Sequence, residues 1–149
     1  MTKFLLAVHV LAAIVAIGPV TVATSMFPPA ARRALAEPDD ARATGTVQLL
    51  HRICRVYAVI GVVVPVFGFA TASNMGVLGD AWLIVSIALT ALAALVLAAL
   101  VLPRQEALAE GRGTREATVR LAMFTGIFNL LWATVTVLMI VRPGSTTGA

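Results

Sequence analysis

Four long apolar runs constrain the fold of this chain more than any other feature. They cover residues 4–27, 49–71, 81–102 and 119–141. Each run is about 21 to 24 residues long, which corresponds to about 32–36 Å of α-helix at 1.5 Å per residue. This length matches a bilayer hydrocarbon core of about 30 Å, and the runs are apolar on all sides, unlike the alternating strands of a barrel. The sequence predicts an all-α, polytopic membrane protein, an antiparallel bundle of four transmembrane helices forming one domain.

The composition excludes several other classes. Hydrophobic residues make up 60% of the 149 residues and charged residues 12%, whereas soluble domains have roughly 45–50% and 25%. A soluble fold of this length buries roughly 70% of its unfolded surface, which is too little to hide such an excess. A soluble enzyme, a disordered chain and a collagen-like fibre are therefore excluded. The net charge of +4 does not indicate a nucleic-acid partner, because the few aromatic residues lie in the apolar runs rather than on a basic face.

The arginines and lysines indicate the orientation. Two segments, 28–48 and 103–118, and the first turns of the helices that follow them carry nine of the eleven basic residues: Arg32, Arg33, Arg42, Arg52, Arg55, Arg104, Arg112, Arg115 and Arg120. The other two are Lys3 and Arg142. The positive-inside rule places both arginine-bearing segments in the cytoplasm and both termini outside. We expect a multi-pass protein of the bacterial cytoplasmic membrane.

Prolines mark the expected ends of the helices. Pro28–Pro29 is expected to end the first helix, Pro103 the third and Pro143 the fourth. A tight turn is expected over residues 74–79. We therefore interpret 28–48 and 103–118 as cytoplasmic loops, each with a short interfacial helix whose arginines meet lipid headgroups.

These two segments resemble each other. The run Ala-Leu-Ala-Glu at 34–37 recurs at 107–110, and Arg42 and Arg115 follow at the same offset. Duplication of a helical hairpin would explain the match, and so would chance similarity between alanine-rich segments.

None of the seven acidic residues lies inside the four runs, and Asp80 sits at the outer edge of the third. Proton- and sodium-coupled carriers usually need an embedded carboxylate, so this class is disfavoured. The sequence also shows no nucleophile–base pair. We therefore identify no catalytic residues, and an enzyme is the less favoured interpretation.

His9 is the first candidate for chemistry, because it lies inside the first run on a face of small residues. One interpretation is a neutral imidazole that hydrogen-bonds across the bundle. A second is an axial ligand of b-type haem or copper, for which Met139 lies at a matching depth. A proton relay or pH sensor is the third.

His51 and Cys54 are three residues apart, near the cytoplasmic start of the second helix. They are weak candidates for a soft-metal site, and the alternative is an interfacial histidine with a small buried thiol. The helical rise separates His51 from His9 by about 20–25 Å, so one haem cannot be bound by both. Cys54 is the single cysteine, which excludes an intramolecular disulfide.

The remaining candidates are structural or lipid-facing. Asn129 lies near the middle of the fourth helix, where it can bond another helix or a second subunit, or line a ligand site. Helix packing and kinks are expected at Gly18, Pro19, Gly61 and Pro65. Arg52 and Arg55 are expected to snorkel, to hold a lipid phosphate or to meet a partner.

The first helix, Leu5-Leu6-Ala7-Val8-His9-Val10-Leu11 with Gly18-Pro19 further on, resembles small actinobacterial-type integral membrane proteins of four helices. These in turn resemble copper-resistance D-type proteins and the membrane protoporphyrinogen oxidase, which carry a histidine early in helix one. The resemblance implies that His9 is a haem or copper ligand. The oxidase type also uses a lysine inside the bundle, whereas the only lysine here is Lys3.

Three functional hypotheses follow. The first is an accessory or structural membrane subunit or scaffold, forming a homo-oligomer or binding a membrane-protein partner, with membrane lipids around it. The second is haem or copper binding at His9. The third is a channel or carrier for a small neutral or lipidic molecule.

Overall fold

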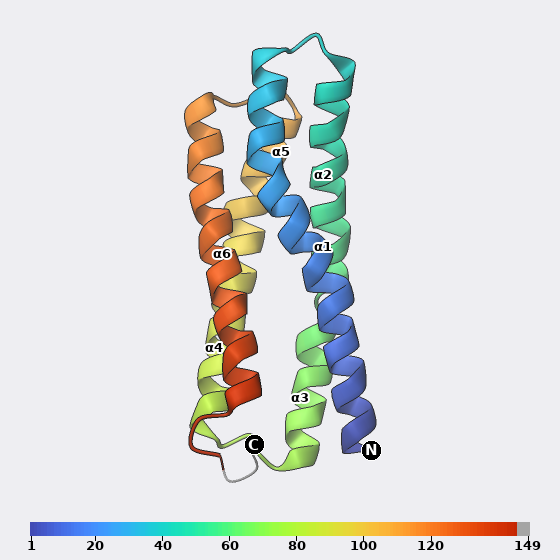
Figure 1. The fold of residues 1–149 in the computed structure, drawn as a ribbon, viewed down its shortest axis with the longest axis vertical. Helices are drawn as coiled ribbons and strands as arrows, with labels where there is room; N and C mark the ends of the chain where they lie inside the picture. Colours follow the sequence, from blue (N-terminus) through green and yellow to red (C-terminus); the bar gives the residue numbers. More distant parts are fainter. Residues whose placement is uncertain (146–149) are drawn as a thin grey trace.

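The computed structural model describes residues 1–145, and within that range the chain forms helices and no strand. The elements are α1 (Thr2–Ala36), α2 (Ala41–Ile60), α3 (Val63–Met75), α4 (Ala81–Leu95), the π-helix η1 (Val96–Val101), α5 (Leu102–Ala109) and α6 (Arg115–Val141). They form an elongated antiparallel bundle in which the N-terminus and the last turn of α6 lie at the same end of the molecule (Figure 1).

Four helical spans in residues 1–145 are long and apolar enough to cross a membrane. They are α1, then α2 with α3, then α4 with η1 and α5, and finally α6. The prediction of an all-α bundle of four helical spans is confirmed, and each span has the length and composition to cross a membrane.

The prediction that Pro28–Pro29 ends the first helix and that a long loop follows is wrong. The structure continues α1 through Pro28 and Pro29 to Ala36, so only residues 37–40 separate it from α2. Pro28 is buried next to the fully buried Phe27, and this packing holds the helix together although each proline removes one backbone hydrogen bond. The segment 28–48 is therefore an extension of two long helices rather than a loop with an interfacial helix.

Pro103 does not end the third span either. The π-helix η1 precedes it, and the wider turn lets the helix path continue past a residue that cannot donate a backbone hydrogen bond. The guanidinium of Arg104 donates to the carbonyl of Leu100 at 3.0 Å and lies over the ring of Phe124, 4.6 Å from its centroid. The helix therefore reaches Ala109, and residues 110–114 replace the expected loop 103–118.

The second span is interrupted near Pro65, where a kink was expected. Pro65 has no backbone N–H to donate to the carbonyl of Gly61, and the backbone N–H of Val64 donates to that carbonyl instead, at 3.1 Å. A Cβ on Gly61 would lie 3.9 Å from the Cβ of Ala16, so α1 passes close to this break. At the far end of α3, Gly76 has φ +69, the left-handed conformation that closes many helices, and the turn over 76–80 follows.

Buried side chains concentrate toward the end of the bundle that carries most of the arginines. α1 packs along α2 and α3, and α4 along α6. The two pairs meet mainly where α1 contacts α6 and α2 contacts α5, and also where the end of α1 contacts α5. The main core contains Phe27, Val47, Cys54, Val101 and Leu121, among others. At the end that carries the N-terminus, a smaller cluster forms around Ala72, Val77, Trp82 and Leu83.

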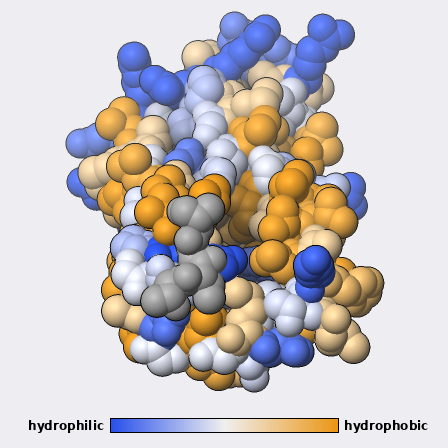
Figure 2. Space-filling model, turned by 60° about the horizontal axis from the view of Figure 1, so that its bottom comes forward, coloured by the Kyte–Doolittle hydropathy of each residue, from blue (hydrophilic) through white to orange (hydrophobic). Residues whose placement is uncertain are grey.

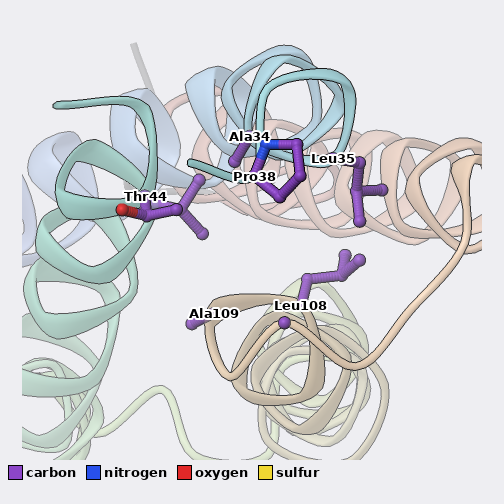
Figure 3. Close-up of a pocket in the computed structure, with 8 residues that line it drawn as sticks. Ala34, Leu35, Pro38, Thr44, Leu108 and Ala109 are labelled. Atoms are coloured by element: carbon purple, nitrogen blue, oxygen red, sulfur yellow. The ribbon is translucent and has the colours of Figure 1, made fainter. Parts of the chain in front are cut away.

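The repeated Ala-Leu-Ala-Glu motif occupies equivalent places. The copy at 34–37 closes α1 and the copy at 107–110 closes α5, with the glutamate as C-cap residue in both. Residues of the two copies line a shared cavity of about 150 Å³, in which Leu35 and Leu108 point toward one another (Figure 3). The two hairpins therefore meet through the same motif. In the turn between α5 and α6, Arg112 pairs with Glu110, and this hydrogen bond raises the pKa of the Arg112 guanidinium.

The surface fits a lipid environment. Apolar side chains cover much of the visible face of the bundle, and hydrophilic residues are prominent toward the end that carries most of the arginines (Figure 2). In α1, Leu11 and Ile14 are more than 60% exposed, and in α6 Leu130 is 71% exposed. Exposure of this extent on mid-helix apolar residues is expected where lipid is the solvent.

The orientation can be tested with single-cysteine variants in a Cys54→Ala background. Asp39 and Asn74 are exposed at opposite ends of the bundle. If the arginine-rich end is cytoplasmic, a membrane-impermeant maleimide will label Asn74→Cys in intact cells and Asp39→Cys only after lysis. The reverse pattern would contradict the predicted orientation.

Candidate functional site

Most hydroxyl groups in the bundle are satisfied within their own helix. The hydroxyls of Thr24, Ser86 and Thr90 each donate to the carbonyl four residues earlier, at 2.7 Å. Polar side chains that reach a different helix therefore stand out, because hydrocarbon offers them no other partner. In the part of the chain that the structure describes, three such links occur, at His9, at His51 and at Asn129.

His9 joins α1 to α3. Its Nδ1 lies 2.8 Å from the carbonyl oxygen of Val64. A carbonyl only accepts, so Nδ1 carries the proton and donates, which leaves the lone pair of a neutral ring on Nε2. The ring fits against Gly68, where a Cβ would lie 2.8 Å from Cε1 of His9. This is the interhelical bond to a carbonyl that the sequence analysis considered.

Met139, the predicted partner of His9 in a cofactor site, packs against the smaller cluster around Trp82 and Leu83. Its carbonyl accepts from Nε of Arg142 at 3.2 Å. The contacts seen for His9 are with α3, so Met139 as a second ligand stays a prediction.

His51 belongs to a buried polar triad with Gln105 and Cys54. Nδ1 of His51 lies 3.2 Å from Oε1 of Gln105, and Nε2 of Gln105 lies 3.5 Å from Sγ of Cys54. Gln105 and Cys54 are fully buried, and His51 is 8% exposed. Because the amide NH₂ points to sulfur, its oxygen accepts from Nδ1–H, and Nε2 of His51 is left buried without a partner.

This triad changes the interpretation of the soft-metal candidates. His51 and Cys54 share a face as expected, but both contact Gln105 from α5, which links α2 to the second hairpin. Within residues 1–145, no group of three or more His, Cys, Asp and Glu side chains comes together to hold a metal ion. His51 and His9 contact different helix segments, and the 13 residues from His51 to Val64 separate them by about 20 Å along the helix, as predicted.

Gln105 was missed because Pro103 was expected to end the helix, which put Gln105 in a loop. A helix continued past Pro103 would have placed this amide in the bundle. The sequence carried little signal, because Gln105 stands between Arg104 and Glu106, just after the end of an apolar run.

Asn129 links α6 to α1, and a hydrogen bond to another helix was one of its predicted roles. Its Nδ2 donates to the hydroxyl of Ser25 at 3.2 Å, and this bond lies at the surface of the bundle. We call the surrounding residues the α1–α6 seam: Thr21, Ser25, Thr125, Asn129 and Trp132. Asn129 is the fifteenth of 27 residues in α6, so the seam lies near mid-span.

The seam has hydrogen-bonding capacity that the chain itself does not use. Four enclosed side-chain atoms there lack a partner: Oγ1 of Thr21, Oγ1 of Thr125, Oδ1 of Asn129 and Nε1 of Trp132. Gly126 and Gly18 flank the seam, and a Cβ on either would meet nothing within 4 Å. The two glycines therefore open the surface at the seam rather than let helices of this chain approach.

The other predicted residues divide into two groups. Gly61 and Pro65 shape the close passage of α1 over the α2–α3 break, as expected, whereas Gly18 faces outward next to Pro19. Arg52 and Arg55 lie exposed on α2, beside His51, in one groove.

Comparisons with known proteins add no family: no protein-family model, curated protein or solved structure matches the chain.

The fit of His9 against Gly68 can be tested by Gly68→Ala. The added Cβ meets the imidazole, so the variant is expected to lose about 1–3 kcal/mol of stability, seen as a lower midpoint of thermal unfolding in mild detergent. Gly126→Ala is the control, because its Cβ meets nothing and the substitution favours the helix. In a His9→Ala background, Gly68→Ala should be neutral or stabilising; a loss of the same size there would contradict the contact.

Proposed function

We propose that the protein is an accessory or structural membrane subunit that associates with another transmembrane helix through the α1–α6 seam. The observation that carries the proposal is the Asn129–Ser25 hydrogen bond, which lies at the bundle surface and near mid-span. A polar pair facing hydrocarbon is unfavourable unless protein covers it. Coverage by a second helix supplies that protection.

The shape of the seam supports the same conclusion. Gly18 and Gly126 leave space beside the polar pair, and small residues at helix surfaces let a neighbouring backbone approach closely. At the surface of the seam, the Asn129 amide and the Ser25 hydroxyl are the groups that a partner helix can hydrogen-bond. Interhelical hydrogen bonds of this kind contribute about 0.6–2 kcal/mol each.

A steric test uses Gly126→Ile. The new side chain points into open space in this chain, so the fold is retained, but it occupies the position a partner helix needs. We expect association, measured by crosslinking in native membranes and by light scattering in mild detergent, to be lost. Gly45→Ile is the matched control, because Gly45 is equally open but lies on exposed α2 near the arginine-rich end.

A polar test uses Asn129→Leu, expected to weaken association about three- to thirty-fold. Thr134→Val is its control, because the Thr134 hydroxyl already bonds the Leu130 carbonyl at 2.7 Å. Crosslinks between two tagged copies identify a homo-oligomer, and crosslinks to another membrane protein identify a hetero-complex. A wild-type protein that stays monomeric and uncrosslinked, or equal effects of test and control variants, would contradict the proposal.

Cofactor binding at His9 is the second candidate. It is favoured by the Val64 contact, which fixes the ring and leaves the Nε2 lone pair for a metal. Under this proposal, protein purified from its own membrane shows a Soret band or stoichiometric copper, and His9→Ala removes it. His51→Ala is the control, and cofactor content equal in the wild type and His9→Ala would contradict the assignment. Transport of a small neutral or lipidic molecule stays a prediction.

A further inference from the structure

One face of α2 forms a groove that the proposed association does not use. It has about 490 Å³ of space and is lined by Gln48, His51, Arg52, Arg55, Val56 and Val59. Its polar residues come first along the helix and its two valines follow, one to two turns closer to mid-membrane. The groove therefore changes from cationic to apolar along the direction in which a lipid molecule lies.

The cationic part has no acidic partner among residues 1–145. Arg52 and Arg55 are exposed, and the ion pair found in residues 1–145 joins Arg112 to Glu110 instead. Two guanidinium groups three residues apart on a helix lie on one face. Guanidinium binds phosphate through paired hydrogen bonds, so this spacing suits a phosphate group at the membrane surface.

His51 supplies a second, independent observation. It is buried, and its Nδ1 is held by Gln105, yet its Nε2 has no partner. A buried polar atom without a partner is unusual in a folded protein. Because His51 also lines the groove, protonation of its ring would let Nε2 donate a hydrogen bond to a bound phosphate ester.

The apolar part suits a hydrocarbon chain. Val56 is 49% exposed and Val59 is 73% exposed, and both line the groove beyond the arginines. We propose that this groove binds an anionic glycerophospholipid, with the phosphate on Arg52 and Arg55 beside His51 and an acyl chain along Val56 and Val59. The site is on α2, whereas the seam is formed by α1 and α6, so each proposal can fail without the other.

The test compares Arg52→Gln/Arg55→Gln with Arg115→Gln/Arg120→Gln. Both pairs are exposed near the same end of the bundle, and both variants remove two charges, but the second pair lies on α6 outside the groove. Each protein is purified in mild detergent and mixed with phosphatidylglycerol, phosphatidylcholine or inorganic phosphate. Native mass spectrometry counts the retained lipid, and thermal unfolding reports stabilisation.

We expect wild type and the Arg115/Arg120 variant to retain phosphatidylglycerol over phosphatidylcholine, and the Arg52/Arg55 variant to retain about ten-fold less phosphatidylglycerol. Val56→Ser/Val59→Ser, which keeps both arginines, should also lower retention. Equal losses in the two arginine variants would show a general charge effect and overturn the proposal. Equal stabilisation by inorganic phosphate and by phosphatidylglycerol would overturn the assignment to a lipid.

Discussion

The absence of hydrogen-bonding partners in hydrocarbon determines most of what this bundle does with its polar groups. Backbone groups are satisfied inside helices, and hydroxyls such as that of Ser86 bond the preceding turn. The polar side chains that cannot do so link different helices: His9 joins α1 to α3, Gln105 joins α5 to α2, and Asn129 joins α6 to α1. Because apolar packing between helices gains little over packing against lipid, these links fix which helices are neighbours and at what register.

The distribution of buried residues has a related cause. α1 is 35 residues long, or about 52 Å, which exceeds a hydrocarbon core of about 30 Å. Its last turns, with the start of α2, extend beyond the apolar runs at the arginine-rich end, where Ala31, Val47 and Leu108 are buried. In that region water is the solvent, so burying apolar surface is favourable in the usual way. Toward the termini, lipid can cover apolar side chains, and the buried residues there are fewer.

The sequence was sufficient for the number, place and type of the helical spans, because a long apolar run has one solution in lipid. It was insufficient at the prolines. A single chain does not show that Phe27 and Pro28 pack well enough to continue α1, or that a π-helix before Pro103 keeps the third span intact. The site residues show the same contrast between what an apolar run indicates and what depends on packing with a distant helix. Asn129 and His9 lie inside apolar runs and were recognised, whereas the role of Gln105 depends on His51, which faces it from a helix more than fifty positions away.

The two hairpins meet through interfaces that correspond to each other. The first helix of each hairpin contacts the second helix of the other, as α1 with α6 and α5 with α2, and the Ala-Leu-Ala-Glu copies occupy equivalent ends. The polar links at these interfaces are nevertheless different. The α1–α6 link lies at the surface near mid-span, whereas the α2–α5 link is buried near the arginine-rich end. A bundle with repeated architecture thus presents two unlike surfaces. The α1–α6 seam is polar and uncharged, and the groove on α2 is cationic. This difference is why we propose a helix as the partner of the first surface and a phospholipid as the partner of the second.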